Sequence, residues 1–138
     1  MSNSLVQPLL ALMLLTLLVW LVMYVRRIGY MRANRISAQQ LSTPDKRSLL
    51  SEPVNRPSNN LINLFEMPVL FYALCLLLMA SNQVDALYVQ LAWAFVGLRA
   101  LHSLIQCTVN IVIWRFVAYL LSSLVLAAMI IRCAMHNF

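Results

Sequence analysis

Long apolar runs separated by short polar segments dominate the amino-acid sequence. A run of about 20 mostly apolar residues is long enough to cross the hydrocarbon core of a bilayer as a helix. Four such runs cover approximately residues 5–25, 61–79, 86–105 and 116–131. The pattern therefore predicts an all-α fold, an integral membrane bundle of four helices, with residues 1–138 forming a single domain.

The composition also indicates that lipid surrounds part of this chain. Hydrophobic residues make up 62% of the 138 residues, and charged residues make up only 10%. A soluble domain has about half apolar and about a quarter charged residues. Because a soluble chain of this length could not bury so much apolar surface, we expect membrane lipid to cover part of it.

The positive charge of the chain is concentrated in one connection. The formal net charge is +6, and seven of the ten basic residues lie between residues 26 and 60, against only Asp45 and Glu52. Such clustering beside a membrane span is typical of membrane orientation, so binding to nucleic acid is not expected. It predicts that loop 26–60 is cytoplasmic and that both termini lie on the other side of the membrane.

Proline residues indicate how loop 26–60 is built. Pro44, Pro53 and Pro57, together with serine and asparagine residues, predict an irregular second half. The first half is compatible with an extension of the first helix beyond the bilayer.

Charged and amide side chains inside the apolar runs gather at one depth, near the expected cytoplasmic ends of the helices. The second run, with the residues just before it, carries two asparagines and a glutamate on one helix face, and the third run, with the residue just after it, carries an arginine, a histidine and a glutamine on one face. An ionisable side chain inside a span costs about 2.5–3.5 kcal/mol on insertion scales, so these groups need an explanation. With the basic residues that flank the first and fourth runs, the set comprises Arg26, Arg27, Asn59, Asn63, Glu66, Arg99, His102, Gln106 and Arg115.

Two explanations of these polar residues are open at this point. Glu66 and Arg99 could form a buried ion pair that fixes helix packing, and His102 could make an interhelical hydrogen bond. Alternatively, several guanidinium groups beside one acid could bind a ligand that carries carboxylates and an ammonium group. The ion pair alone would not explain the excess of positive charge nearby.

The motifs at these positions resemble those of the MAPEG family, the membrane-associated proteins of eicosanoid and glutathione metabolism. The segment Asn63-Leu-Phe-Glu66 is similar to the N-x-x-E signature of the family's second helix, and Arg99-Ala-Leu-His102 is similar to the R-x-x-H pattern of its third. The resemblance covers nearly the whole chain and looks most like the bacterial branch. It implies a left-handed four-helix bundle assembled as a homotrimer, in a bacterial inner membrane with both termini periplasmic.

The resemblance also implies glutathione as co-substrate, bound between subunits near the cytoplasmic face. The implied glutathione-binding residues are Arg26, Asn59, Asn63, Glu66, Arg99, His102 and Gln106. Arg115 and Arg27 are the implied catalytic residues, because a guanidinium group favours the thiolate form of a thiol. The family often has an arginine at the position of Asn59, for which Arg56, one turn away, is a candidate substitute.

The sequence thus predicts a glutathione-dependent transferase or peroxidase that acts on lipophilic small molecules from the bilayer. A non-catalytic lipid- or glutathione-binding scaffold on the same fold is the alternative, favoured by Asn59 and by the lack of tyrosines in the predicted cleft. A proton-coupled exporter is disfavoured because an arginine-lined cleft repels cations. The cysteines Cys75, Cys107 and Cys133 form no metal-binding pattern with the histidines, so no metal is expected.

Overall fold

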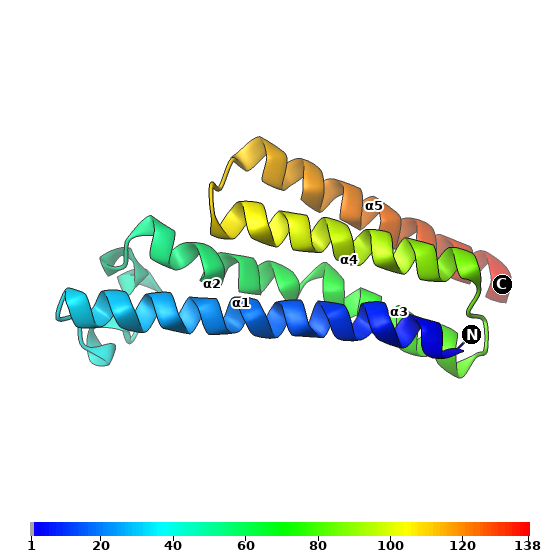
Figure 1. The fold of residues 1–138 in the computed structure, drawn as a ribbon, viewed down its shortest axis with the longest axis horizontal. Helices are drawn as coiled ribbons and strands as arrows, with labels where there is room; N and C mark the ends of the chain where they lie inside the picture. Colours follow the sequence, from blue (N-terminus) through cyan, green and yellow to red (C-terminus); the bar gives the residue numbers. More distant parts are fainter. Residues whose placement is uncertain (1) are drawn as a thin grey trace.

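The computed structural model describes residues 2–138, and these residues form helices joined by turns and short irregular segments (Figure 1). The long helices are α1 (Val6–Ala33), α2 (Glu52–Leu64), α3 (Met67–Ala80), α4 (Ala86–Cys107) and α5 (Val112–Asn137), and the short 3-10 helices are η1 (Ser2–Leu5), η2 (Ala38–Leu41) and η3 (Pro44–Leu49). The prediction of an all-α fold is confirmed.

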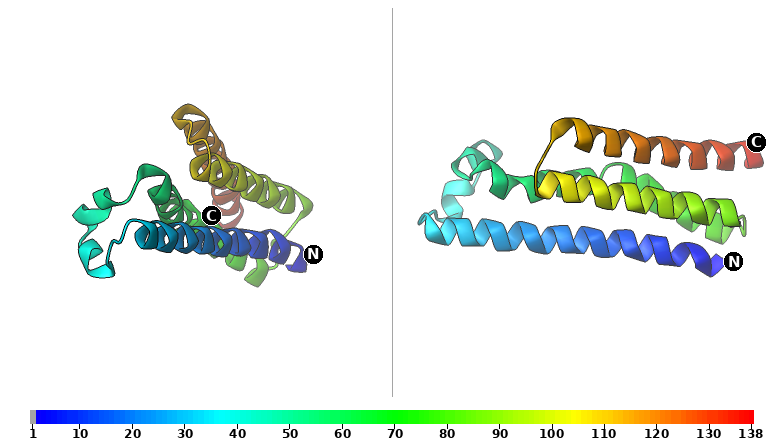
Figure 2. Two further views of the ribbon diagram at one scale, coloured as in Figure 1. Left: turned by 60° about the vertical axis from the view of Figure 1, so that its left-hand side comes forward. Right: turned by 45° about the horizontal axis from the view of Figure 1, so that its top comes forward.

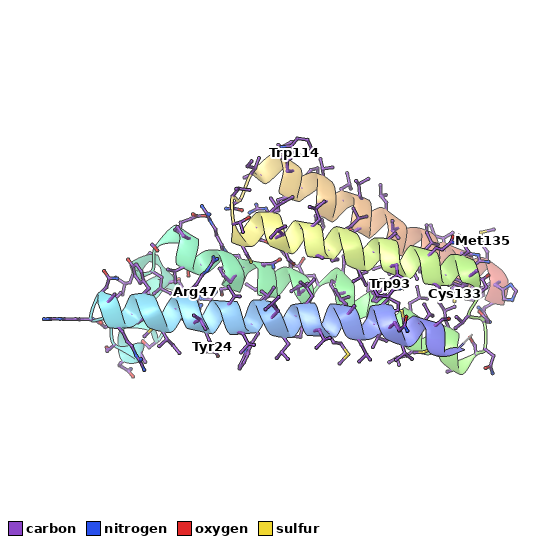
Figure 3. All side chains as sticks on the ribbon, viewed as in Figure 1. Tyr24, Arg47, Trp93, Trp114, Cys133 and Met135 are labelled. Carbon is purple, nitrogen blue, oxygen red and sulfur yellow. The ribbon has the colours of Figure 1, made fainter. Side chains whose placement is uncertain are left out.

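Four helical stretches within residues 2–138 are long and apolar enough to cross a membrane. They are Val6–Ala33, Glu52–Ala80, Ala86–Cys107 and Val112–Asn137. Their outer surfaces carry large apolar side chains, including Trp114 and Met135 near the two ends of α5, which are 62% and 79% exposed (Figure 3). Exposed apolar surface on this scale fits helices that are solvated by lipid.

The helices run side by side, with α4 and α5 forming a hairpin beside α1 and the α2–α3 stretch (Figure 2). The chain termini lie at the same end of the bundle, and the segment between α1 and α2 lies at the other end (Figure 1). The core forms where apolar residues recur on one face of each helix, as in the stacked rings of Phe71 and Phe95, whose centroids are 4.6 Å apart. On α5, buried Ala118 and Ser122 let α4 pack closely.

The basic segment 26–60 contains more helix than the sequence predicted. Helix α1 continues through Arg26 and Arg27 to Ala33, as the sequence allowed, whereas α2 already begins at Glu52, where an irregular chain was expected. Pro53 does not prevent this, because a proline in the first turn of a helix loses no intrahelical hydrogen bond. The acid at Glu52 also suits the positive end of the helix dipole. Helix α5 is likewise longer than the predicted run 116–131.

The second membrane-spanning stretch is broken, although the sequence predicted one continuous run over 61–79. Helix α2 ends at Leu64 and α3 begins at Met67, with Phe65 and Glu66 between them. Pro68 has no N–H to donate to the carbonyl of Leu64, and its ring collides with that carbonyl in a straight helix. The break therefore follows from Pro68, and it turns Glu66 away from the continuous helix face that the sequence predicted.

At the end of the bundle that holds the termini, the polar side chains pair with one another. Arg132 donates to both carboxylate oxygens of Asp85, at 2.9 and 2.5 Å, and its guanidinium carbon lies 4.3 Å from the centre of the Tyr88 ring. Asp85 also accepts from the backbone N–H of Tyr88 at the start of α4. Gln83 and Asn137 exchange two hydrogen bonds. We call these five residues the far-end clasp.

Candidate functional site

The first contact of the candidate site joins Glu66 to Tyr119. Glu66 stands at the break between α2 and α3, and its side chain is exposed. The hydroxyl of Tyr119, from α5, donates to Oε2 of Glu66 at 3.3 Å. An exposed carboxylate with this single side-chain partner keeps its other oxygen available to a ligand.

The second contact joins the asparagine of the N-x-x-E motif to α4. Nδ2 of Asn63 donates to Oε1 of Gln106 at 3.0 Å and lies 3.4 Å from Nε2 of His102. Nδ1 of His102 lies 3.0 Å from the carbonyl oxygen of Arg115. Because a carbonyl oxygen only accepts, Nδ1 carries the proton and Nε2 is the acceptor that faces Asn63. The interhelical hydrogen bond considered for His102 is therefore present.

Arg99 is the centre of the site and has no hydrogen-bond acceptor. Its side chain is fully buried, and Nε, Nη1 and Nη2 make no hydrogen bond. Its guanidinium carbon lies 4.6 Å from the centre of the Tyr119 ring and 5.4 Å from that of Phe95. Aromatic faces attract a cation but accept its N–H groups only weakly, so the donors of Arg99 make no conventional hydrogen bond.

The direct ion pair between Glu66 and Arg99, one of the two open explanations, does not form. The ion pairs among residues 2–138 are Arg56 with Glu52 and Arg132 with Asp85. Tyr119 lies against the guanidinium group of Arg99 and bonds to Glu66 through its hydroxyl. The acid and the buried cation are thus linked through an aromatic side chain and not directly.

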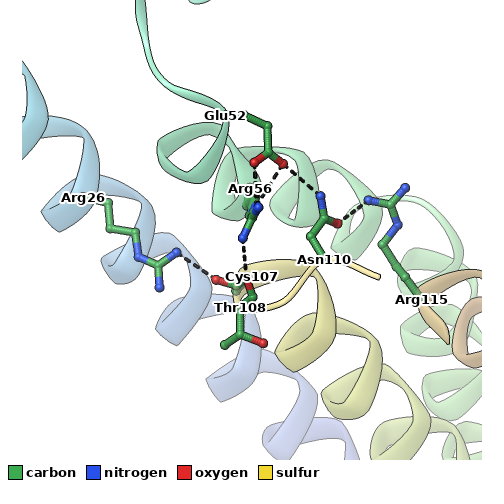
Figure 4. Close-up of polar contacts among 7 residues, drawn as sticks. All are labelled: Arg26, Glu52, Arg56, Cys107, Thr108, Asn110 and Arg115. Carbon is green, nitrogen blue, oxygen red and sulfur yellow. Dashed lines mark hydrogen bonds and ion pairs between the residues drawn. The ribbon is translucent and has the colours of Figure 1, made fainter. Parts of the chain in front are cut away.

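A second polar network closes the same end of the bundle around the turn between α4 and α5 (Figure 4). Arg56 pairs with Glu52 at 2.7 Å and donates to the carbonyl of Thr108. Asn110 donates to Oε1 of Glu52 at 2.9 Å and accepts from Nη1 of Arg115 at 2.7 Å. Asn110 has a φ of 50°, a left-handed conformation that asparagine tolerates better than most residues, and this turn holds its amide between the two charges.

The paired arginines at the end of the predicted first run lie apart from each other. Arg26 donates from Nη1 to the carbonyl of Cys107 at 2.8 Å, at the C-terminal end of α4, where unpaired carbonyls accept such bonds. Arg27 instead lines a separate cavity with residues of the α1–α2 connection. Successive residues of a helix point about 100° apart, which explains why only one of the two faces α4. Within one subunit Arg27 therefore lies away from Arg115, and its catalytic role, which the resemblance implied at a site between subunits, stays a prediction.

Asn59 also lies outside the contacts predicted for it. Its side chain is exposed, whereas the neighbouring Asn60 is fully buried. Asn60 accepts from Ser103 at 3.3 Å, and its Nδ2 lies 3.6 Å from the sulfur of Cys107. The side of α2 that packs on α4 therefore carries Asn60 and Asn63, and the implied glutathione contact of Asn59 stays a prediction.

The sequence interpretation missed Tyr119, and it wrongly expected no tyrosine in the cleft. Tyr119 contacts Glu66 and Arg99, and its ring centre is 5.7 Å from that of His102. A usable signal was present, since Tyr119 follows Arg115 by four positions and therefore shares its helix face. We call the connected set the polar layer; its members are Asn63, Glu66, Arg99, His102, Gln106, Arg115 and Tyr119.

An apolar groove runs from α1 to the residues just before Glu66. It has a volume of about 630 Å³ and is lined by Leu61, Leu64 and Phe65, by Tyr72 and by residues of α1 that include Trp20. Phe65 is adjacent to Glu66 in the chain, but the residues that line the groove do not include any member of the polar layer.

Comparison with known proteins agrees with these features. Neither the curated proteins nor the solved structures gave a match to this chain. The model of the MAPEG family matches residues 5–135, nearly the whole chain, including both helix motifs and the membrane-spanning stretches. The protein belongs to the MAPEG family.

Proposed function

We propose that this MAPEG protein is a glutathione-dependent transferase or peroxidase that acts on lipophilic electrophiles from the bilayer. The observation that carries the proposal is the polar layer, in which an exposed acid, a tyrosine hydroxyl and a buried cation meet inside an apolar bundle. Such groups are costly within a membrane and are expected where they bind a polar ligand.

The charges of the polar layer suit the charges of glutathione. Glutathione carries one ammonium group, two carboxylates and a thiol. The exposed carboxylate of Glu66 suits the ammonium group, and the half-buried guanidinium of Arg115 and amide of Asn63 suit the carboxylates. The unpaired positive charge of Arg99 adds to the attraction for an anion from behind the Tyr119 ring.

The same groups can promote formation of the thiolate. A thiol has a pKa of about 8.5 and is mostly protonated at neutral pH. The Tyr119 hydroxyl would turn its one hydrogen from Glu66 to the sulfur and, with the Arg99 cation against its ring, would stabilise the sulfur anion once the thiol proton has passed to water. The thiolate would then form a bond to the electrophilic atom while the leaving group departs with the electron pair of the broken bond.

The apolar groove supports the second half of the proposal. It is lined mainly by apolar side chains of α1, α2 and α3, and one of them, Phe65, lies in the break next to Glu66 in the chain. A lipophilic electrophile would enter from the membrane, whereas glutathione would enter from water. The two substrates would thus meet at the polar layer by separate routes.

Three measurements on the purified protein in detergent test this function. They are glutathione binding, thiolate formation and the conjugation of glutathione to chlorodinitrobenzene. We expect Glu66→Gln and Arg115→Ala to lose both glutathione-dependent thermal stabilisation and conjugation, because each loses a charge that a substrate group would contact. Cys75→Ala is the control, since Cys75 is buried in the apolar core away from the polar layer. Full activity of Glu66→Gln would remove the main support for the proposal.

A non-catalytic binding protein is the second candidate, and one observation favours it. Arg115 and Arg56 are already held by Asn110 and by Glu52 within the chain, and Asn59 supplies no further cation. Ultraviolet absorbance of the thiolate separates the two candidates. Glutathione binding without a thiolate signal, and without conjugation, would favour a scaffold that binds glutathione or lipid.

The proposal includes a homotrimer in a bacterial inner membrane, with both termini periplasmic. The seven basic residues between positions 26 and 60 support a cytoplasmic position for that segment. Large apolar side chains on every helix leave ample surface for contacts between subunits. The mass of the detergent-solubilised protein, corrected for bound detergent, tests the trimer. Single cysteines introduced at the two termini of the protein, and labelled from outside in intact cells, test the orientation.

A further inference from the structure

A basic cavity lies at the end of α1, apart from the polar layer. It has a volume of about 280 Å³. Two arginines, Arg27 of α1 and Arg47 of η3, line it together with the hydroxyl-bearing residues Ser42 and Thr43 and nearby apolar residues. The cavity thus combines two cations with two neutral donors.

Two of the hydrogen-bond donors of Arg27 have no acceptor within the protein. Its Nε and Nη2 atoms are buried and make no hydrogen bond. Within the described residues, both ion pairs involve other arginines, so neither Arg27 nor Arg47 is paired with an acid. Buried donors without acceptors are costly, and an anion with several oxygens in the cavity would satisfy them.

The cavity lies at the level of lipid headgroups. The apolar part of α1 from Val6 to Val25 is about 30 Å long at about 1.5 Å per residue, which matches the hydrocarbon core. Arg27 follows within two residues. Trp20 and Tyr24, whose ring centres are 4.9 Å apart, are both more than 40% exposed, as expected for aromatic residues at the membrane interface. Tyr24 precedes Arg27 by three positions and shares its helix face.

We propose that this cavity binds the phosphate group of an anionic phospholipid, with Arg27 and Arg47 as its charged donors. The planar guanidinium group matches phosphate geometry and can donate two parallel hydrogen bonds. The hydroxyl groups of Ser42 and Thr43 supply further donors at the cavity wall. The excess of seven basic over two acidic residues between positions 26 and 60 draws anionic lipid toward the site.

This site is independent of the proposed glutathione site. Arg26, the neighbour of Arg27, donates to the α4 carbonyl of Cys107, whereas Arg27 lines the cavity formed with the α1–α2 connection. Loss of lipid binding therefore tests Arg27 and Arg47, and loss of glutathione binding tests the polar layer. Each proposal can fail while the other holds.

Native mass spectrometry of the full-length protein released from nanodiscs tests the proposal. The nanodiscs contain equal amounts of phosphatidylcholine and phosphatidylglycerol, and the ratio of the two retained lipids is measured. We expect phosphatidylglycerol to be enriched on the wild-type protein and the enrichment to fall about tenfold in Arg27→Gln and in Arg47→Gln, because each removes charge-assisted hydrogen bonds. Arg47 is exposed, so its substitution leaves the fold intact even if Arg27→Gln disturbs α1.

Matched controls separate a built site from general attraction. Arg32→Gln and Arg35→Gln remove the same charge from exposed positions of the same segment, and we expect both to keep the wild-type enrichment. An equal loss in all four variants would mean diffuse electrostatic binding and would overturn the proposal.

Soluble competitors identify the source of the phosphate. Inorganic phosphate and short-chain phosphatidylglycerol are added separately to the detergent-solubilised protein, and thermal stabilisation is compared. Stabilisation by the short-chain lipid alone, lost in Arg47→Gln, supports the lipid site. Equal stabilisation by inorganic phosphate, or displacement of the retained lipid by glutathione, would overturn it.

Discussion

The two ends of the bundle are built from the same kinds of side chain but differ in how they are paired. Each end places an arginine against a tyrosine ring, Arg99 at 4.6 Å from Tyr119 and Arg132 at 4.3 Å from Tyr88. Each end also carries an acid. In the far-end clasp Asp85 bonds directly to the arginine, whereas in the polar layer Glu66 bonds only to the tyrosine hydroxyl.

This difference separates a structural contact from a candidate binding site. In the far-end clasp the charges are paired: Arg132, Asp85 and the Tyr88 backbone satisfy one another, although these residues also line a cavity of about 520 Å³. In the polar layer the charges are not paired, because Arg99 is fully buried with three nitrogens that make no hydrogen bond and Glu66 is exposed. Buried donors without acceptors are costly, and they are retained where a ligand interacts with their charge. We therefore expect ligand binding at the polar layer and not at the far-end clasp.

The strongest test of the comparison removes the hydroxyl that connects the acid to the cation. We expect Tyr119→Phe to lower kcat for glutathione conjugation about 10²–10³-fold, the usual cost of losing one donor to a developing anion. KM for glutathione should change less, because Glu66 and Arg115 remain. Steady-state kinetics with chlorodinitrobenzene measure both constants.

Tyr30→Phe is the matched control for this change. Tyr30 lies on α1 near its end and outside the polar layer, so we expect unchanged kinetics. If Tyr119→Phe kept the wild-type kcat, the tyrosine would be a packing residue, and the polar layer would resemble the far-end clasp.

A second test exchanges the buried cation for an apolar side chain of similar length. Replacement of a buried ion pair by apolar residues is often neutral or stabilises a protein by about 1–4 kcal/mol, and Arg99 is a buried charge without a paired acid. We therefore expect Arg99→Met to raise the melting temperature in detergent and to abolish the stabilisation by glutathione. Gain of stability with loss of binding is the expected pattern for a residue retained for function.

Arg132→Met is the control from the other end. It removes the partner of Asp85, so we expect a slightly lower melting temperature and unchanged glutathione binding. The shift should be smaller than that of Arg99→Met and opposite in sign. A loss of stability in Arg99→Met would show that Arg99 also serves mainly to hold the fold.

The sequence predicted the features that follow from helix periodicity. Apolar runs marked the membrane-spanning helices, and the spacing of Asn63, His102 and Gln106 placed them on faces that meet. Residues three, four or seven positions apart share a helix face whatever the partner helix is. Periodicity thus groups the residues of each helix on one face, and the packing of α2 on α4 brings the two faces together.

The features that the sequence did not predict depend on single backbone events. The break at Phe65 and Glu66 follows from one proline in the next turn, and Arg26 and Arg27 diverge because neighbours on a helix point in different directions. Tyr119 was missed because an aromatic residue in an apolar run is usually a packing residue. Only the approach of α5 to the break between α2 and α3 shows that it contacts an acid.

The smallest expected effect concerns the acid of the far-end clasp. The hydrogen bonds from Arg132 and from the backbone N–H of Tyr88 lower the pKa of Asp85 from 3.8 to about 2. Because the folded-state pKa is depressed, the ionised carboxylate stabilises the fold above pH 4, and this stabilisation is lost as the pH falls from about 4 to about 2. Asp85 and Arg132 are partly exposed, so solvent weakens the effect.

We expect the melting temperature of the wild-type protein to exceed that of Asp85→Asn slightly at pH 5 and to approach it near pH 2. A difference that stays constant over this range would mean that the ion pair does not hold the two helices together, and the far end would then owe its closure to Gln83 and Asn137.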